Sequence, residues 1–273
     1  MNKLKALSKE QKDCWIENGY VKLSNIFSTK EIEEISKEYD DLFERKKQED
    51  IDGLESAWIG DDMKKLSGNR NTTVKSIHNL QMHSGVFTKL ITNEKLLDAL
   101  EDVLETGDIL LHHTKAHVKP PEKGAPYLMH QDYPYFPYKN HTMLAVFLHL
   151  DDTTPENGGL AIYPGSQKLG PLPDRVLIDD NGDSYHYVDP DKYPLSNATS
   201  ISAKRGEIIM FSYLLLHGSY LNLSSRPRRM FLMQVRAADD EPTKDVHKSP
   251  CQGLVLRGRN TSRVANMLNR FTL

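Results

Sequence analysis

Cysteine is scarce in this chain of 273 residues, where Cys14 and Cys251 are the only two. Two cysteines cannot build the disulfide framework of a small secreted protein, so we expect a cytoplasmic or other reducing intracellular compartment. Residues 1–13 are polar and lysine-rich and lack the apolar stretch of a signal peptide. Residues 271–273 read Phe-Thr-Leu, which is not the Ser-Lys-Leu peroxisomal signal. Neither a secretory signal nor a C-terminal peroxisomal signal is therefore expected.

Long apolar runs and a basic excess are also missing. No stretch approaches the roughly 18 apolar residues that a membrane-spanning helix needs, so no membrane partner is expected. The 35 Lys and Arg residues stand against 38 Asp and Glu residues, a net charge of -3, which argues against a nucleic-acid partner. The 38% of hydrophobic residues are enough for a sizeable core.

The N-terminal part, about 8–105, shows helical patterns. The spacing predicts a helix over 8–18 and a short strand over 20–23. A capping box, Ser28-Thr29-Lys30-Glu31, begins a second helix. A single third helix is predicted over 86–104, closed near Gly107.

After Gly107 the pattern changes to short apolar stretches separated by proline, glycine and polar residues. This is typical of a β-barrel or sandwich rather than of alternating strands and helices. Strands are expected at 143–150, 160–163, 207–216 and 230–235. No repeat or linker divides the chain, so we expect one domain over 1–273 with a barrel core at about 109–240.

The polar connection from Asp179 to Ser200 is long and joins two barrel segments. It carries four side chains with an aromatic ring, namely Tyr185, His186, Tyr187 and Tyr193. Long connections without structure of their own in compact domains are often lids. We expect this loop to border the mouth of a pocket and to become ordered when substrate binds, with a mobile surface insertion as the alternative.

The sequence His130-Gln131-Asp132 places an imidazole and a carboxylate two residues apart. On one strand, residues i and i+2 project to the same face. A third ligand, His217, ends the apolar stretch 207–216. Two histidines and one carboxylate form the facial triad that holds Fe(II) and leaves positions open. Zn²⁺ accepts the same ligands, so the triad alone leaves the metal undecided.

Two arginines, Arg228 and Arg229, lead into the predicted strand at 230–235. A charge that enters a barrel is costly unless an anion meets it. A guanidinium can hold a carboxylate by two parallel hydrogen bonds. The two side chains point to opposite faces of the strand, so one of them faces the interior, and periodicity does not say which. The alternative is a surface turn rich in arginine.

These residues together resemble the phytanoyl-CoA dioxygenase family of Fe(II)/2-oxoglutarate-dependent oxygenases. The resemblance is carried by His130-Gln131-Asp132, His217-Gly218-Ser219 and Arg228. The stretches 156–160 and 164–167 also resemble the family, and the similarity covers about residues 10–240. The resemblance implies a mainly β fold with flanking α: a double-stranded β-helix, a jelly-roll or cupin-like barrel with N-terminal helices packed outside. It implies that His130, Asp132 and His217 hold the iron.

The resemblance also implies cosubstrate-binding residues. Arg228 lies eleven residues beyond His217, at the family's 2-oxoglutarate position, with Ser219 supporting the same carboxylate and Gln131 beside the cosubstrate. A further candidate is Lys75, with His78 as its alternative. Lys115 departs from the family pattern, and it either binds a carboxylate or faces outward.

The implied activity is hydroxylation of a small-molecule or acyl-CoA substrate, in the manner of phytanoyl-CoA 2-hydroxylase, with O₂ as cosubstrate and ascorbate as reductant. Lys64, Lys65 and Arg70 are candidates for contacts with CoA phosphates, although a solvated surface loop is the favoured explanation. The presence of Asp132 argues against a halogenase, which leaves that ligand position free. Three alternatives remain: a catalytically silent protein that binds iron or 2-oxoglutarate, a zinc hydrolase or isomerase, and an oxygenase for an amino acid or other metabolite.

Overall fold

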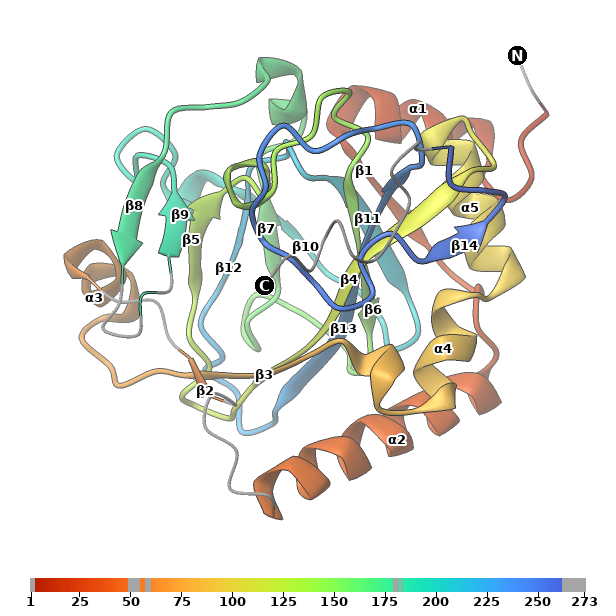
Figure 1. Cartoon of the computed structure of the whole chain (residues 1–273). Helices are drawn as coiled ribbons and strands as arrows, with labels where there is room; N and C mark the ends of the chain where they lie inside the picture. The colour runs from red at the N-terminus through yellow and green to blue at the C-terminus, as the bar shows by residue number, and fades with distance from the viewer. Residues whose placement is uncertain (1–2, 49–54, 57–59, 179–181, 183, 262–273) are drawn as a thin grey trace.

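The computed structural model describes residues 3–48, 55–56, 60–178, 182 and 184–261 (Figure 1). No helix in these ranges is long and apolar enough to cross a membrane. The helices are α1 (Lys9–Asn18), α2 (Thr29–Gln48), α3 (Asp61–Ser67), α4 (Gly85–Ile91) and α5 (Glu94–Leu104). The strands are β1 (Tyr20–Leu23), β2 (Glu55–Ser56), β3 (Val74–His78), β4 (Ile109–Lys119), β5 (Tyr127–His130), β6 (Leu144–His149), β7 (Leu160–Ile162), β8 (Arg175–Ile178), β9 (Ser184–Tyr187), β10 (Thr199–Ile201), β11 (Ile208–Ser212), β12 (His217–Ser219), β13 (Arg228–Ala237) and β14 (Val255–Arg257).

Two antiparallel sheets form the core of the fold. The larger sheet has the order β1-β11-β6-β13-β4-β3-β2, with β14 paired to β4, and the smaller one has the order β10-β7-β12-β5. A separate hairpin, β8-β9, lies beside β5 (Figure 1). The architecture is the double-stranded β-helix that the family resemblance implied, with the N-terminal helices outside the larger sheet.

Strand β6 shows how one apolar stretch serves two layers. Val146 and Leu148 pack into the cluster shared with the helices, whereas Ala145 and Phe147 pack into the cluster between the sheets. Because both faces are covered, the strand reads as a continuous apolar run rather than an alternation. The hydroxyl of Tyr39 on α2 donates to the carbonyl of His117 on β4 over 2.9 Å, which fixes the helix to the sheet.

The helix boundaries confirm most of the predicted ones. Ser8 and Gly19 cap α1, and the Ser28–Glu31 capping box begins α2. The single helix predicted over 86–104 is wrong. The chain instead breaks between α4 and α5, because the Asn93 side chain accepts the Leu96 N–H and starts a new helix there. Glu105 ends α5 in the left-handed conformation, with φ at 60°, before Gly107 is reached.

Two predicted features of the barrel segment are also wrong. The strand expected over 207–216 ends at Ser212, whose carbonyl accepts the Leu215 N–H as the chain turns from the larger sheet to the smaller one. The turn stays apolar because it is buried, so hydropathy did not reveal it. The connection 179–200 does have structure, since β9 pairs with β8. Its residues 179–181 and 183 lie outside the described ranges.

Candidate active site

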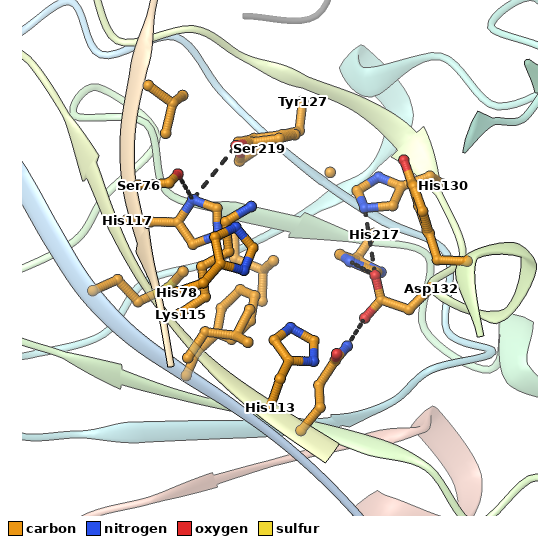
Figure 2. Close-up of a pocket in the computed structure, with 18 of the residues that line it drawn as sticks. Ser76, His78, His113, Lys115, His117, Tyr127, His130, Asp132, His217 and Ser219 are labelled. Atoms are coloured by element: carbon orange, nitrogen blue, oxygen red, sulfur yellow. Dashed lines mark hydrogen bonds and ion pairs between the residues drawn. The ribbon is translucent and has the colours of Figure 1, made fainter. Parts of the chain in front are cut away.

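A cavity of about 410 Å³ lies between the two sheets. One wall carries His130, Asp132 and His217, and the opposite wall is formed by β3 and β4 (Figure 2). Apolar side chains such as Phe147 and Leu232 line other parts. The cavity therefore combines a candidate metal site with a shielded space for a small molecule.

The two histidines meet because their strands pair. His217 on β12 is the register partner of His130 on β5, and the ring centroids are 4.2 Å apart. Asp132 lies beyond the end of β5, with φ at -75° and ψ at -19°, so the expectation that it shares a strand with His130 is wrong. The turn still brings its Oδ1 to 3.8 Å from His130 Nε2 and 3.6 Å from His217 Nε2.

Hydrogen bonds orient the two histidine side chains. The Nδ1 atoms of His130 and His217 lie 2.8 and 2.9 Å from the carbonyls of Leu128 and Leu215. A carbonyl only accepts, so each Nδ1 carries the hydrogen and each Nε2 keeps its lone pair. Backbone partners of this kind are usual for metal-binding histidines. The three ligand atoms lie within 4.8 Å of one another.

Burial sets the protonation of this group. It lowers the pKa of His130 to about 3, with His217 adding to the effect, and it lowers the pKa of His217 to about 4. Burial also raises the pKa of Asp132 to about 6. Both imidazoles are therefore neutral at pH 7, which is the form that binds metal. Two neutral imidazoles and a carboxylate match the donor set of a non-haem Fe(II) site.

Arg228 is a buried cation that faces the cavity. It is 4% exposed, and its guanidinium donates to the carbonyl of Gly158 over 3.0 Å. No carboxylate of the described residues pairs with it, and its Nε has no hydrogen-bond partner there. Burial lowers the pKa of Arg228 to about 10, so the group stays charged. A buried, charged side chain without a counter-ion marks a place for an anion.

Lys119 lies beside Arg228. Its Nζ donates to Ser219 Oγ over 2.7 Å and to the Tyr220 carbonyl over 2.6 Å. Burial, and then the charge of Arg228, hold the pKa of Lys119 well below its usual value. Gly158 makes room for this lysine, since a Cβ there would lie 2.6 Å from Lys119 Cδ.

Arg229 faces the opposite way, as the alternation predicted. Its Nε donates to Asp151 Oδ2 over 3.1 Å, and one terminal nitrogen donates to Asp151 Oδ1 over 2.6 Å. The other donates to Asp40 of α2 over 2.6 Å. The choice between the two arginines, which periodicity left open, is thus decided by packing: Arg228 lines the cavity and Arg229 joins α2 to the sheet.

The remaining predicted site residues differ in where they lie. Ser219, Lys115 and His78 line the cavity. Lys75 does not, because Val74, Ser76 and His78 of β3 take the positions that face inward. Gln131 is buried outside the cavity lining, where its amide donates to the Leu214 carbonyl over 2.6 Å and its Oε1 accepts the Leu172 N–H over 2.9 Å. It joins neighbouring turns rather than facing the space for a cosubstrate.

Sequence reasoning missed several lining residues. Polar side chains occupy every second position at the end of β4, at residues 113, 115, 117 and 119, and all four line the cavity, although only Lys115 among them was predicted. That alternation in an otherwise buried strand was the signal that could have found them. Gln234 on β13 and His247, beyond the barrel strands, had no comparable signal.

The chain is similar to known proteins in sequence and in fold. The sequence profile of the phytanoyl-CoA dioxygenase (PhyH) family matches residues 15–230. The chain is 27% identical to a probable alpha-ketoglutarate-dependent hypophosphite dioxygenase of Stutzerimonas stutzeri, over 92% of this chain and 87% of that protein. It is also 27% identical to a methylphosphonate hydroxylase of Gimesia maris, over 85% of this chain and 81% of that protein. The crystal structure of apo EctD from S. alaskensis matches in fold, with a TM-score of 0.70 at 19% identity over 95% of this chain and 88% of that one.

Proposed function

Because this chain belongs to the phytanoyl-CoA dioxygenase family, whose members are Fe(II)- and 2-oxoglutarate-dependent oxygenases, we propose that it hydroxylates a small organic molecule in the cavity between its two sheets. His130, Asp132 and His217 would hold the iron. The observation that carries this proposal is the convergence of two Nε2 lone pairs and one carboxylate oxygen. Each of the three side chains is oriented by a hydrogen bond at its other polar atom.

Arg228, Lys119 and Ser219 would bind the carboxylate of 2-oxoglutarate that lies away from the metal. Arg228 and Lys119 are buried and lack a carboxylate partner among the described residues, so an anion between them offsets the cost of holding both side chains charged. A guanidinium presents two parallel N–H groups to a carboxylate, and the ammonium and hydroxyl add further donors. This assignment adds Lys119 to the residues that the family resemblance implied.

When bound, iron and 2-oxoglutarate supply the oxidation by O₂, with ascorbate proposed as the reductant that keeps the iron active. The protein's own residues orient the reactants. Gln234 holds one oxygen of Asp132 so that the other faces the metal position. The apolar side chains of Phe147 and Leu232 limit the water that reaches the reacting groups.

Small anions are the substrates we favour. The two relatives described above are named for hypophosphite and methylphosphonate, both compact phosphorus oxyanions. Asp132 is the only acidic side chain among the described residues that line the cavity, against three basic ones other than histidine: Lys115, Lys119 and Arg228. A cavity of this size and charge suits a small anion better than a long apolar chain.

An acyl-CoA thioester is the second candidate. It is favoured by the exposed Lys64 and Lys65 on α3, whose Met63 packs against Leu128 of β5 next to the cavity. The ammonium groups of these lysines lie within 4.0 Å of the carboxylates of Asp61 and Asp62. The neighbouring negative charges weaken the attraction of the lysines for a phosphate. Succinate release in the presence of phytanoyl-CoA, compared with release in the presence of methylphosphonate, separates the two substrate classes.

The test of the proposed reaction is succinate release from 2-oxoglutarate with Fe(II) and ascorbate. We expect succinate from the unaltered protein and none from His130→Ala, Asp132→Ala or His217→Ala, each with reduced iron content and an unchanged fold. His83→Ala, which changes an exposed histidine away from the cavity, is the matched control. Iron binding without succinate under all substrates would identify a catalytically silent protein. Activity with Zn²⁺ and without 2-oxoglutarate would identify a hydrolase or isomerase.

A further inference from the structure

A second polar group lies across the cavity from His130, Asp132 and His217. It consists of His78 on β3, His113 and Lys115 on β4, and His247 from the segment that follows β13, and we call it the distal cluster. Figure 2 shows His78, Lys115 and His113 on the wall opposite the candidate metal ligands. The proposed chemistry at iron and 2-oxoglutarate uses none of these side chains.

Strand pairing builds this cluster from three parts of the chain. His78 is the register partner of Lys115, so the two side chains lie on neighbouring strands at the same level. His113 and Lys115 share the inward face of β4. A bulge opposite Gln234 and Val235 adds one residue to β4, and it leaves the imidazoles of His112 and His113 next to each other, with their Nδ1 atoms 2.8 Å apart.

The segment after β13 contributes the last member. His247 lies with its ring centroid 5.0 Å from that of His113. The segment is held on both sides of this point: Thr243 donates from its backbone N–H to the Pro137 carbonyl, and Ser249 Oγ donates to Asn79 Oδ1 over 2.7 Å. The family profile ends at residue 230, so this contribution belongs to a part of the chain beyond the family match.

The charges of the cluster suit an anion. His78 stays partly open to solvent, but the protein around it, and then the charge of Lys115, lower its pKa below the usual value. Burial and the neighbouring His112 hold the pKa of His113 well below its usual value. These imidazoles are therefore neutral at pH 7. His78 offers one N–H donor, and His113 offers one from Nε2 when its Nδ1 accepts from His112. Lys115 supplies the positive charge that lowers the pKa values of both. The described lining holds no carboxylate on this wall.

We propose that the distal cluster binds the anionic end of the substrate, and that this end is a tetrahedral oxyanion such as a phosphonate. Donors that come from β3, β4 and the 241–254 segment reach one group from several sides, which matches the arrangement of oxygen atoms around phosphorus better than a planar carboxylate. Bound there, the substrate would extend toward the metal ligands on the opposite wall. The inference rests on the proposed function, and it names the substrate class and the residues that select it.

A second metal ion is the competing occupant, because ligand atoms of His112, His113 and His247 lie within 4.8 Å of one another. Two observations favour the anion. Lys115 is close enough to affect the pKa of both His113 and His247, and its charge repels a cation. The contact between the Nδ1 atoms of His112 and His113 has hydrogen-bond length, so one of their two lone pairs is already used and only one is left for a metal.

The test is binding of methylphosphonate to the full chain, loaded with Fe(II) and 2-oxoglutarate without O₂, by calorimetry. We expect Lys115→Met to weaken methylphosphonate binding at least about tenfold, which equals about 1.4 kcal/mol, since it removes a charge-assisted contact. Lys115→Arg, which keeps the charge, should weaken it less, and His247→Ala should also weaken it. Binding of 2-oxoglutarate should change less than about twofold in all three variants. Lys89→Met, at an exposed lysine of α4, is the matched control.

Other outcomes would contradict the subsite, the class of its ligand or the proposed function. If the unaltered protein binds iron and 2-oxoglutarate but not methylphosphonate, or if Lys115→Met binds it equally well, the subsite is absent. If acetate binds more tightly than methylphosphonate, the tetrahedral class is wrong. If the chain retains two Zn²⁺ ions and His247→Ala retains one, the cluster is a metal site. Failure to bind iron or 2-oxoglutarate at all would instead refute the proposed function.

Discussion

Gln234 donates from Nε2 to Oδ2 of Asp132 over 2.7 Å, although the two residues are 102 positions apart in the chain. Gln234 lies in the middle of β13 and is 2% exposed, so its amide is held by the sheet. The bond leaves Asp132 Oδ1 directed toward the two histidines. A residue that sequence reasoning overlooked therefore orients the proposed carboxylate ligand.

Replacement of Gln234 tests this role. Gln234→Leu replaces the amide donor with an apolar side chain of similar size. The carboxylate of Asp132 can then rotate away from the metal position. We expect the dissociation constant for Fe(II) to rise by about tenfold, the low end of the usual effect of residues that orient metal ligands. Metal titration measures it, with Gln48→Leu at an exposed position of α2 as the control. Unchanged iron affinity in a folded Gln234→Leu protein would show that Asp132 is oriented without this bond.

The two adjacent arginines should separate cosubstrate binding from stability. Arg228→Ala removes a buried cation that faces the cavity, at a cost of about 1.5–3 kcal/mol for each hydrogen bond to the charge. The dissociation constant for 2-oxoglutarate should therefore rise by tenfold or more. Arg229→Ala removes the ion pairs with Asp40 and Asp151, so it should lower the melting temperature and leave 2-oxoglutarate binding nearly unchanged. Calorimetric titration of both variants decides, and equal effects on binding would contradict the assignment.

Lys119 predicts a proton linkage. Its pKa is held low in the free protein by burial and by Arg228, and a bound carboxylate would raise it toward the usual value. In the pH range between these two pKa values, 2-oxoglutarate binding takes up a proton, so affinity should increase as the pH falls. Below the lower pKa the lysine is already charged and the linkage disappears.

Calorimetry in buffers of different ionisation enthalpy measures this proton uptake on iron-loaded protein. We expect Lys119→Met to bind 2-oxoglutarate more weakly and to lose the uptake. Lys139→Met, at an exposed lysine, should keep both properties. Proton release by the unaltered protein, or uptake that persists in Lys119→Met, would show that another group is responsible.

The segment 179–200 remains a predicted lid, now with contacts for its described part. Ser184 and Tyr185 line the cavity, and the backbone N–H of His186 donates to the Tyr135 hydroxyl over 2.8 Å. We expect amide exchange in 184–188 to slow when 2-oxoglutarate and substrate are bound, because a closed cavity excludes water. Hydrogen-exchange mass spectrometry measures this, with α5 as the internal reference. Unchanged exchange here, while β12 becomes protected, would contradict the lid.

The sequence by itself determined the features that depend on local pattern. Short apolar stretches and turn residues predicted a β-barrel or sandwich after residue 107. The helical spacing from residue 8 and the capping box at Ser28 predicted where the first two helices begin. The spacing of His130, Asp132 and His217 grouped three side chains whose ligand atoms the structure brings within 4.8 Å. These patterns are readable because they arise from backbone periodicity and from hydrogen bonds between near neighbours.

Only the tertiary structure decided which side chains share the cavity. Packing directs Arg228 inward, whereas the resemblance that suggested Gln131 and Lys75 could not show that one is bound to neighbouring turns and the other is on the outer face of β3. The bulge in β4 and the position of His247 depend on pairing between segments far apart in the chain. Such contacts are set by the register of whole sheets, which no short window of sequence contains.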